Sequence, residues 1–519
     1  MRLQKLDFSD TRSFSSFFLD YIQKKDSLKP FYGHFPEVEN FKAQIAEKSK
    51  AYSDANRKVL AEVLQKQYQD IDSTEQVKQN LSSLKENTTF TVTTGHQLNI
   101  FTGPLYFIYK IVTVVNTCKE LKKQYPQYNF VPVYWMASED HDYDEIKYFR
   151  LYGKKHTWET TQTGAVGRFN PETIAKLFSE IPGDIELFKK AYKQKTLSAA
   201  VRHYVNALFA HEGLVVVDAD DRSLKTLFQH VIRDDVFDHI PKKLVEDQNS
   251  KLELLGYHPQ VFARDINFFY LDKDLRSRLE VSDDTFRVVD TALQFSKSEI
   301  EKMIVEEPEK FSPNVILRPL YQEVILPNLA YAGGPAEVVY WLQLKKVFDH
   351  FKVPFPVLMP RNFALIIDTP VSRKFEKTGL EYSHLFEEKN FLFNQWIVKN
   401  TVHDLSLGKE IQAMGNLFSG IRDQAAVIDP TLIKFIEAQR QRTLNGLDKA
   451  EQKILRAEKR LHTDKLAQLE AVKEELFPKG SPQERVDNFL NFYQKDPQFI
   501  EHLLNTFDPF DFKFNLLFY

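Results

Sequence analysis

The chain has a single cysteine, Cys118, among its 519 residues. It can therefore form neither an intramolecular disulfide nor a thiolate cluster, and we expect no bound metal cluster. The neighbouring sequence, TVVNTCKEL, is typical of a helix interior. Cys118 is accordingly expected to be a small buried side chain rather than a nucleophile.

Long apolar runs and a strong net charge are also missing. No segment approaches the roughly 18 apolar residues of a membrane span, and the start, MRLQKLDFSDTRSF, has no apolar signal core. The formal net charge of −3 provides no basic field for duplex nucleic acid. We therefore expect a cytoplasmic protein with no membrane or nucleic-acid partner.

Several catalytic motifs are absent. The chain has no C-x-x-C, H-E-x-x-H, G-x-S-x-G or Walker pattern. These absences argue against zinc-dependent proteases of the H-E-x-x-H type, α/β-hydrolases and P-loop nucleotide hydrolases.

What is present is enough apolar material for two or three domains: 43% hydrophobic and 13% aromatic residues over a long chain. After polar helical sequence at 36–88, a β-branched run at 88–95 predicts a strand, 104–126 a helix and 130–138 a buried strand. This order is a βαβ unit, typical of an α/β protein whose ligand lies at the carboxyl ends of parallel strands. Further strands are predicted at 213–220, 314–319, 353–360 and 364–368, and helices at 222–240 and 335–351.

The later part of the chain has a different character. Ile433, Leu447, Ile454 and Leu461 fall in a heptad pattern, which predicts a coiled-coil arm with 371–400 as its antiparallel partner. An intramolecular hairpin and a homodimer both remain open. We predict three regions: a core at 1–370 with insertions near 150–290, an arm at 371–480, and a segment at 481–519 that packs back on the core.

The turn after the first strand, GHQLNIFTGP, carries more polar side chains than a connection needs. A helix start can bind an anion, so Thr102 and Gly103 are predicted to bind a nucleotide phosphate. His96 could donate a hydrogen bond to charge that develops on a transferring group. The alternative is that Thr102 only caps the helix, while His96 and Asn99 make turn hydrogen bonds.

The segment SEDHDYDE, at 138–145, begins where the second strand ends. Five of the seven residues from Glu139 to Glu145 are acids, and His141 lies among them. Crowded carboxylates repel one another, so this loop could bind a cation such as an ammonium group or Mg²⁺. Its carboxylates could also accept hydrogen bonds from ribose hydroxyls. The alternative is a solvated acidic loop.

A third candidate combines RPLYQE, at 318–323, with LAYAGGPAEVVYW, at 329–341. Arg318 can bind a carboxylate or phosphate through two hydrogen bonds, and Pro335 marks a second helix start. The alternative is that both Gly-Pro segments only begin helices. The aspartates at 218, 220 and 221 are equally well explained as strand-end caps.

Four segments together resemble the cysteine-adding enzymes of bacillithiol biosynthesis, the BshC family: TTGHQLNIFTGPLYFIYKI, VPVYWMASEDHDYDEI, SPNVILRPLYQEVILPNLAYAGGPAEVVYW and SPQERVDNFLNFY. The resemblance implies a Rossmann-like core with connecting-peptide insertions and a coiled-coil domain, similar to class I aminoacyl-tRNA synthetases. It also implies a ligase that adds cysteine to the amine of glucosaminyl-malate, the last step of bacillithiol formation. It places a substrate pocket at the Rossmann core.

Those synthetases use ATP through HIGH and KMSKS motifs. Gly95-His96-Gln97 matches the first only in part, and the second is missing, so use of ATP with Mg²⁺ is an open expectation. We predict catalytic roles for His96, Glu139, Asp140 and His141. Substrate binding is predicted for Gln97, Asn99, Asp142, Arg318, Tyr321, Gly333, Gly334 and Glu337. The alternative is a non-catalytic binding or scaffold protein that acts through its arm.

Overall fold

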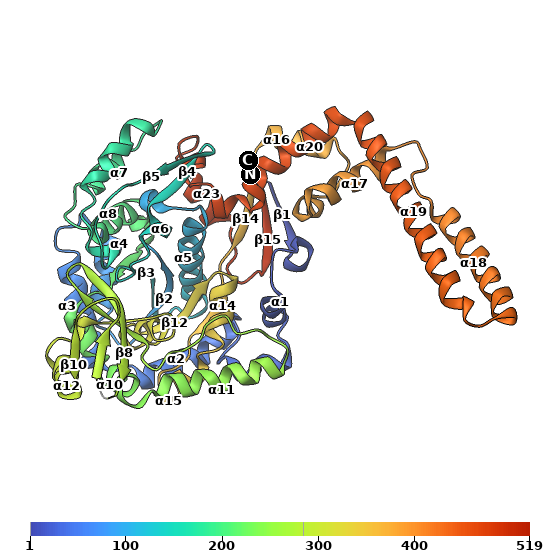
Figure 1. Cartoon of the computed structure of the whole chain (residues 1–519). Helices are drawn as coiled ribbons and strands as arrows, with labels where there is room; N and C mark the ends of the chain where they lie inside the picture. The colour runs from blue at the N-terminus through green and yellow to red at the C-terminus, as the bar shows by residue number, and fades with distance from the viewer. Residues whose placement is uncertain (1, 284) are drawn as a thin grey trace.

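The computed structural model describes residues 2–283 and 285–519, and its centre is a five-stranded parallel sheet (Figure 1). The strand order is β13-β12-β2-β3-β6, and all four neighbouring pairs are parallel. The strands are β2 (Thr89–His96), β3 (Asn129–Met136), β6 (Val215–Asp218), β12 (Asn328–Gly333) and β13 (Val357–Pro360). The predicted α/β, Rossmann-like fold is therefore confirmed.

The first βαβ unit forms where the sequence predicts it. Helix α5 (Tyr106–Gln124) joins β2 to β3 and is buried along most of its length, including Cys118. Its apolar residues lie on nearly every face because it packs between the sheet and other parts of the chain, including α23 (Phe499–Thr506). The helix begins at Tyr106 rather than Pro104, since Phe101, Thr102 and Gly103 all have positive φ angles.

The prediction of a strand at 314–319 is wrong. Those residues form a turn into α13 (Arg318–Ile325), and the strand beside β2 is β12. Asn314 stabilises the turn: its side chain accepts from the Ile316 N–H at 2.8 Å, and its carbonyl accepts from the Arg318 N–H at 2.8 Å. A short apolar run does not by itself distinguish strand from turn.

Two predicted helices are each broken in two. Residues 222–240 form α9 (Arg222–Thr226) and α10 (Gln229–Asp238), and residues 335–351 form α14 (Pro335–Trp341) and α15 (Lys345–His350). The second break places the buried amide of Gln343 against Asn249 of α11 (Ile240–Leu254), at 2.6 Å. This contact gives the buried Gln343 amide the hydrogen-bond partner that a buried polar group requires.

Helices and an antiparallel sheet surround the central sheet. The polar segment before β2 forms α2 (Phe41–Ala51), α3 (Asp54–Gln67) and α4 (Glu75–Ser83), as predicted. Residues between β3 and β12 add α6 (Tyr143–Ile146), the hairpin β4 (Tyr148–Leu151) and β5 (Lys154–Thr157), α7 (Glu186–Ala191), α8 (Leu197–Phe209) and α12 (Lys297–Glu306). They also add a sheet of order β10-β9-β8-β7-β11, made of β7 (Phe268–Asp272), β8 (Leu275–Ser282), β9 (Thr285–Val288), β10 (Gln294–Ser296) and β11 (Phe311–Pro313).

The two ends of the chain lie side by side in a third sheet (Figure 1). Strand β15 (Lys513–Phe518) pairs with β1 (Arg2–Asp7) on one side and β14 (Phe363–Ile367) on the other. Residues 481–519 also form α21 (Gln483–Val486), α22 (Leu490–Tyr493) and α23, which packs against α5.

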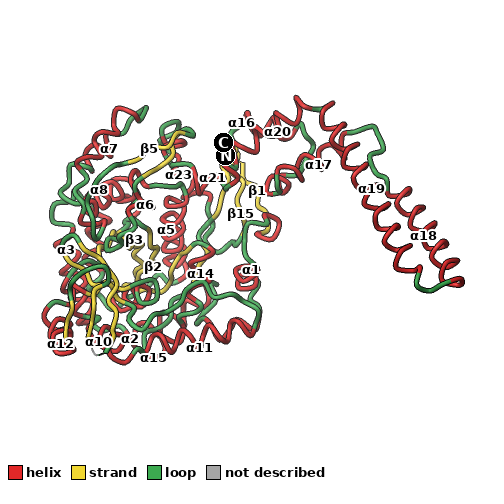
Figure 2. Tube along the Cα trace, viewed as in Figure 1, coloured by secondary structure: helices red, strands yellow, loops and turns green. Residues whose placement is uncertain are grey.

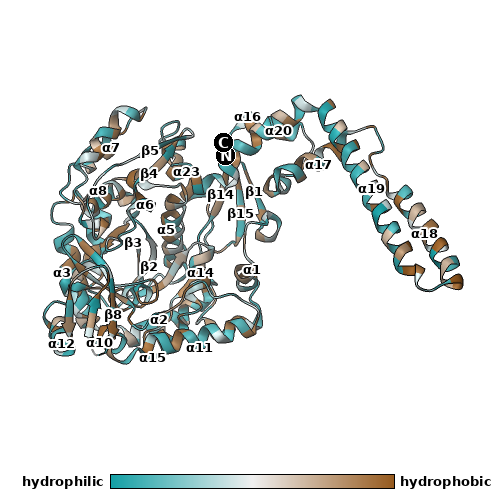
Figure 3. Cartoon of the chain, viewed as in Figure 1, coloured by the Kyte–Doolittle hydropathy of each residue, from teal (hydrophilic) through white to brown (hydrophobic). Residues whose placement is uncertain are grey.

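A long helical hairpin projects away from these sheets (Figure 2). It consists of α18 (Gly408–Ile428) and α19 (Leu432–Leu461), and α20 (Thr463–Leu476) returns to the body of the protein. The predicted partner, 371–400, is wrong: it forms α16 (Thr369–Glu376) and α17 (Lys389–Asn400), and α17 contacts only the base of the arm, while α18 pairs with α19. Apolar and polar residues alternate along the arm (Figure 3), and no helix in the described chain is long and apolar enough to cross a membrane.

Gly103 is expected to be essential for the turn between β2 and α5. Its φ angle is +63°, and a Cβ atom there would lie 2.5 Å from the Asn99 Cβ. We expect Gly103→Ala to lower the free energy of unfolding by about 2–4 kcal/mol, through backbone strain and this collision.

The matched control is Gly153→Ala. Gly153 also has a positive φ angle, +78°, but nothing lies within 4 Å of its Cβ position. Urea unfolding should show a loss near 1 kcal/mol for Gly153→Ala. Equal losses in the two variants would contradict the steric part of this account.

Candidate functional site

A cavity of about 670 Å³ lies at the carboxyl ends of β2, β3 and β12. Parallel sheets of this type bind ligands at that edge. Three of the predicted segments contribute to its wall: the end of β2, the acidic loop and the start of α14. The predicted residues that line the cavity are His96, Gln97, Glu139, Asp140, His141, Arg318, Gly334 and Glu337.

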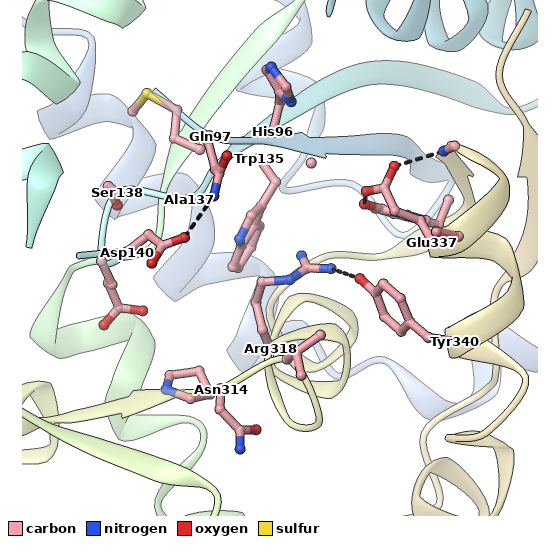
Figure 4. Close-up of a pocket in the computed structure, with 18 of the residues that line it drawn as sticks. His96, Gln97, Trp135, Ala137, Ser138, Asp140, Asn314, Arg318, Glu337 and Tyr340 are labelled. Atoms are coloured by element: carbon pink, nitrogen blue, oxygen red, sulfur yellow. Dashed lines mark hydrogen bonds between the residues drawn. The ribbon is translucent and has the colours of Figure 1, made fainter. Parts of the chain in front are cut away.

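Asp140 is the most firmly held carboxylate of the acidic loop. Its side chain accepts a hydrogen bond from Gln97 Nε2 at 3.1 Å (Figure 4) and another from the His141 N–H at 2.7 Å. Burial alone would raise the pKa of Asp140, but Arg276 and these hydrogen bonds outweigh burial and lower it. Asp140 is therefore an ionised group whose oxygens are already engaged.

Arg276, on β8, joins the antiparallel sheet to the acidic loop. Its Nη1 lies 3.5 Å from Asp140 Oδ1 and 2.5 Å from His141 Nδ1, and its guanidinium stacks 4.0 Å from the Phe269 ring. Burial, followed by the charge of Arg276, lowers the pKa of His141. His141 is thus a neutral hydrogen-bonding group at neutral pH.

Arg318 faces the cavity from the opposite side (Figure 4). Its Nη1 lies 3.3 Å from Gln322 Oε1 and its Nη2 lies 3.4 Å from Tyr340 Oη. Over residues 2–283 and 285–519, Arg318 makes no ion pair with a carboxylate. A guanidinium held by neutral partners in a cavity is suited to bind an anionic ligand.

Glu337 is tied into the cavity wall. Its carboxylate lies 2.6 Å from Lys110 Nζ and accepts from the Gly334 N–H at 2.7 Å and from Tyr331 Oη at 2.7 Å. Burial alone would raise the pKa of Glu337, but Lys110 and these hydrogen bonds outweigh burial and lower it to about 2. The Gly334 N–H at the start of α14 therefore binds the carboxylate of Glu337 and is not free to bind an anionic ligand.

The ion pair between Glu337 and Lys110 should make the protein less stable in acid. Glu337 has a folded-state pKa of about 2 against an ordinary value of 4.5, so its contribution is complete above about pH 4.5 and disappears as the pH falls toward 2. The loss should be up to about 3 kcal/mol. Urea unfolding at several pH values should show a shallower decline for Glu337→Gln, and parallel curves would contradict the assignment.

His96 lies at the end of β2, with its ring against Tyr106 and Phe107. Burial, followed by the nearby charge of Lys110, lowers the pKa of His96 to about 3. Its Nε2 has no hydrogen-bond partner within the described chain. A neutral imidazole can still donate one hydrogen bond, which is the role the sequence suggests.

Comparison with known families agrees with this architecture. Residues 1–362 match the family described as "Bacillithiol biosynthesis BshC, N-terminal Rossmann-like domain", and residues 364–519 match its C-terminal coiled-coil domain. The chain belongs to the BshC family. The resemblance noted in the sequence is therefore confirmed.

Relatives in this family cover almost the whole chain. The protein is 39% identical to one from Flavobacterium johnsoniae over 99% of both chains, and 39% identical to one from Cytophaga hutchinsonii over 100% of this chain and 99% of that one. It is 30% identical to one from Chloroherpeton thalassium over 93% of both chains. Each of these relatives is named "Putative cysteine ligase BshC".

The structure of this BshC family member does not bring Thr102 and Gly103 into the cavity. Thr102 is buried, and its hydroxyl neither caps a helix nor finds a partner in the described chain. The residues after α21 cover this turn: the Leu105 N–H donates to the Asp487 carbonyl at 2.7 Å, and Asn488 Nδ2 donates to the Gly103 carbonyl at 2.6 Å. The predicted phosphate site at the start of α5 is thus already filled by protein.

Four predicted substrate-binding residues also lie away from the main cavity. Tyr321 is fully buried and donates to the Ala219 carbonyl, and Gly333 lies within β12 and accepts from the Arg361 N–H. Asn99 donates to the Glu145 carbonyl and lines a smaller neighbouring pocket, while Asp142 caps α6. The Asn99 side chain therefore joins its turn to the end of the acidic loop and, in the described chain, makes no hydrogen bond within the turn itself.

The cavity also contains residues that sequence reasoning missed. Lys110 is a charged residue in the middle of an apolar helix, which could have marked it. Arg276 and Tyr340 have no sequence signal, because their roles depend on distant segments. Arg264 and Arg485 also line the cavity, and neither makes an ion pair within the described part of the chain.

Proposed function

We propose that this protein joins the carboxylate of cysteine to the amine of glucosaminyl-malate, the final step of bacillithiol formation. The observation that carries the proposal is the position of Arg318, a cation with no acidic partner in the described chain, across the cavity from Glu139 and Asp140. Membership of the BshC family and the names of its relatives support ligation of cysteine in bacillithiol biosynthesis.

The charges on the two sides of the cavity match the proposed substrates. Glucosaminyl-malate carries an amine at one end and two carboxylates at the other, and cysteine is a zwitterion. Arg318 suits the carboxylates, while Glu139 and Asp140, the two acids of the loop that line the cavity, suit an amine. The volume of about 670 Å³ is in the range of small-molecule sites.

We include ATP with Mg²⁺ as the cosubstrate that supplies a leaving group on cysteine's carboxylate, because a free carboxylate does not form an amide at neutral pH unaided. Arg264 and Arg485, which also line the cavity, fit a phosphate chain, whereas the start of α5 does not. The protein's own residues hold the carboxylates of the cavity in place. Gln97 and Arg276 fix Asp140, and Lys110 fixes Glu337.

The test is to incubate purified protein with cysteine, glucosaminyl-malate, ATP and Mg²⁺ and to follow products by mass spectrometry. Bacillithiol together with AMP would indicate an adenylate, and bacillithiol with ADP an acyl phosphate. Binding of glucosaminyl-malate without any bacillithiol would contradict the proposal. It would favour the alternative, a binding or scaffold protein that acts through its arm.

A further inference from the structure

The three acids that begin the acidic loop occupy different environments. Asp142 accepts from the Glu145 N–H at 3.2 Å, caps α6 and is exposed. Asp140 is held by Gln97, Arg276 and backbone N–H groups. Neither has a free, partly desolvated oxygen, which a general base in this cavity needs.

Glu139 differs from both. Its side chain is 12% exposed and lines the cavity, and its Oε1 lies 2.5 Å from Lys225 Nζ. In the described chain this is its one side-chain hydrogen bond, so Oε2 remains without a donor. Glu139 thus offers the cavity one carboxylate oxygen while the other is fixed.

Lys225, on α9, cannot itself reach a ligand. Its side chain is 0% exposed, and its Nζ also donates to the Phe311 carbonyl at 2.7 Å and lies 4.8 Å from the centre of the Tyr321 ring. These contacts give Lys225 one orientation. The ring of Tyr321, which is fully buried, packs against this ammonium group.

From this geometry we propose that Glu139 is the general base of the ligation and that Lys225 is the positioning residue that holds it. The inference rests on the proposed function. The amine nitrogen of glucosaminyl-malate bonds to the carbonyl carbon of cysteine activated by a nucleoside triphosphate. The N–H proton passes to Glu139 Oε2, and the phosphate-bearing leaving group departs with the electron pair of its C–O bond.

The charges around Glu139 fit this role. Lys225 on α9, Arg276 on β8 and Asp220 after β6 face it, and Asp220 is itself paired with Arg168 at 2.7 Å. Burial raises the pKa of Glu139 to about 7, although Lys225 opposes that increase. A base whose pKa lies near the working pH combines a large ionised fraction with a useful proton affinity.

The test compares Glu139→Gln with Asp144→Asn, an acid of the same loop whose side chain is 82% exposed and pairs only with Lys147 within the described chain. Glu139→Gln keeps the shape and can still accept from Lys225. We expect it to lower kcat for bacillithiol formation at least about 100-fold, with the Kd for glucosaminyl-malate changed less than about threefold. Asp144→Asn should match the wild type.

The pH profile provides a second readout. In the wild type, kcat should rise with pH through about 7, as Glu139 loses its proton, and Glu139→Gln should lack this rise. Lys225→Met removes a charge that lowers the pKa of Glu139, so the rise should move to higher pH. If Lys225→Met does not fold, Glu139→Gln still decides the question.

The outcomes separate the two proposals. If the wild type forms bacillithiol and Glu139→Gln keeps its rate and pH profile, the assignment of the base is wrong while the function stands. If the wild type forms no bacillithiol, the proposed function fails and the inference fails with it.

Discussion

Replacing Arg318 with glutamine is expected to lower kcat/KM for glucosaminyl-malate about 100-fold. Arg318 lies in the cavity with Tyr340 and Gln322 as neutral neighbours and makes no ion pair in the described chain, so its charge is available to a ligand carboxylate. Charge-assisted hydrogen bonds contribute about 1.5–3 kcal/mol each, and a bidentate contact involves two of them. Isothermal titration should show most of this loss in binding.

A truncated ligand tells whether the lost contact is to the malyl group. Methyl glucosaminide has the amine and the sugar but no carboxylate, so Arg318→Gln should bind it as the wild type does. Arg278→Gln is the control, since Arg278, on β8, pairs with Glu280 and does not line the cavity. An equal loss for both ligands would contradict carboxylate recognition by Arg318.

The largest effect on stability is expected from Arg361→Met. Arg361 Nη2 lies 2.6 Å from Glu484 Oε1, and the two side chains are 2% and 3% exposed. The pair joins the region that matches the Rossmann-like domain to the region that matches the coiled-coil domain. Removing one partner leaves a buried charge, which should lower the free energy of unfolding by about 3–5 kcal/mol.

The double variant Arg361→Met, Glu484→Met provides the control. It removes both charges, so its loss should be smaller than that of Arg361→Met alone, although the Ala364 N–H then loses its acceptor. Urea unfolding followed by circular dichroism measures both. A loss below about 1 kcal/mol for Arg361→Met would show that the pair does not hold the two regions together.

The sequence predicts those parts of the fold that depend on local pattern. The segments 88–95, 104–126 and 130–138 combine length, β-branching and turn residues, and they form β2, α5 and β3 within a few residues. The run 314–319 has no such support and becomes a turn. The arm partner was misassigned because the heptads of α19 do not say which helix lies opposite, and α18 is the next helix along the chain.

The residues of the site also fall into those that the sequence predicts and those that only the tertiary structure shows. Residues at strand ends, such as Gln97, Glu139 and Asp140, are predictable because the ends of parallel strands meet at one edge of a sheet. The sequence does not show that Thr102 and Gly103 lie outside the cavity, because the segment that covers them, near Asp487, is almost 400 residues away in sequence. Lys225 and Arg276 reach the acidic loop from separate elements, and only the tertiary structure shows that contact.

A crystal structure of the protein with glucosaminyl-malate tests the central claim most directly. The account predicts a malyl carboxylate within hydrogen-bond distance of the Arg318 guanidinium and the sugar amine within hydrogen-bond distance of Glu139 Oε2. A ligand bound outside the cavity, or with its amine toward Arg318 and its carboxylates toward the acidic loop, would contradict it.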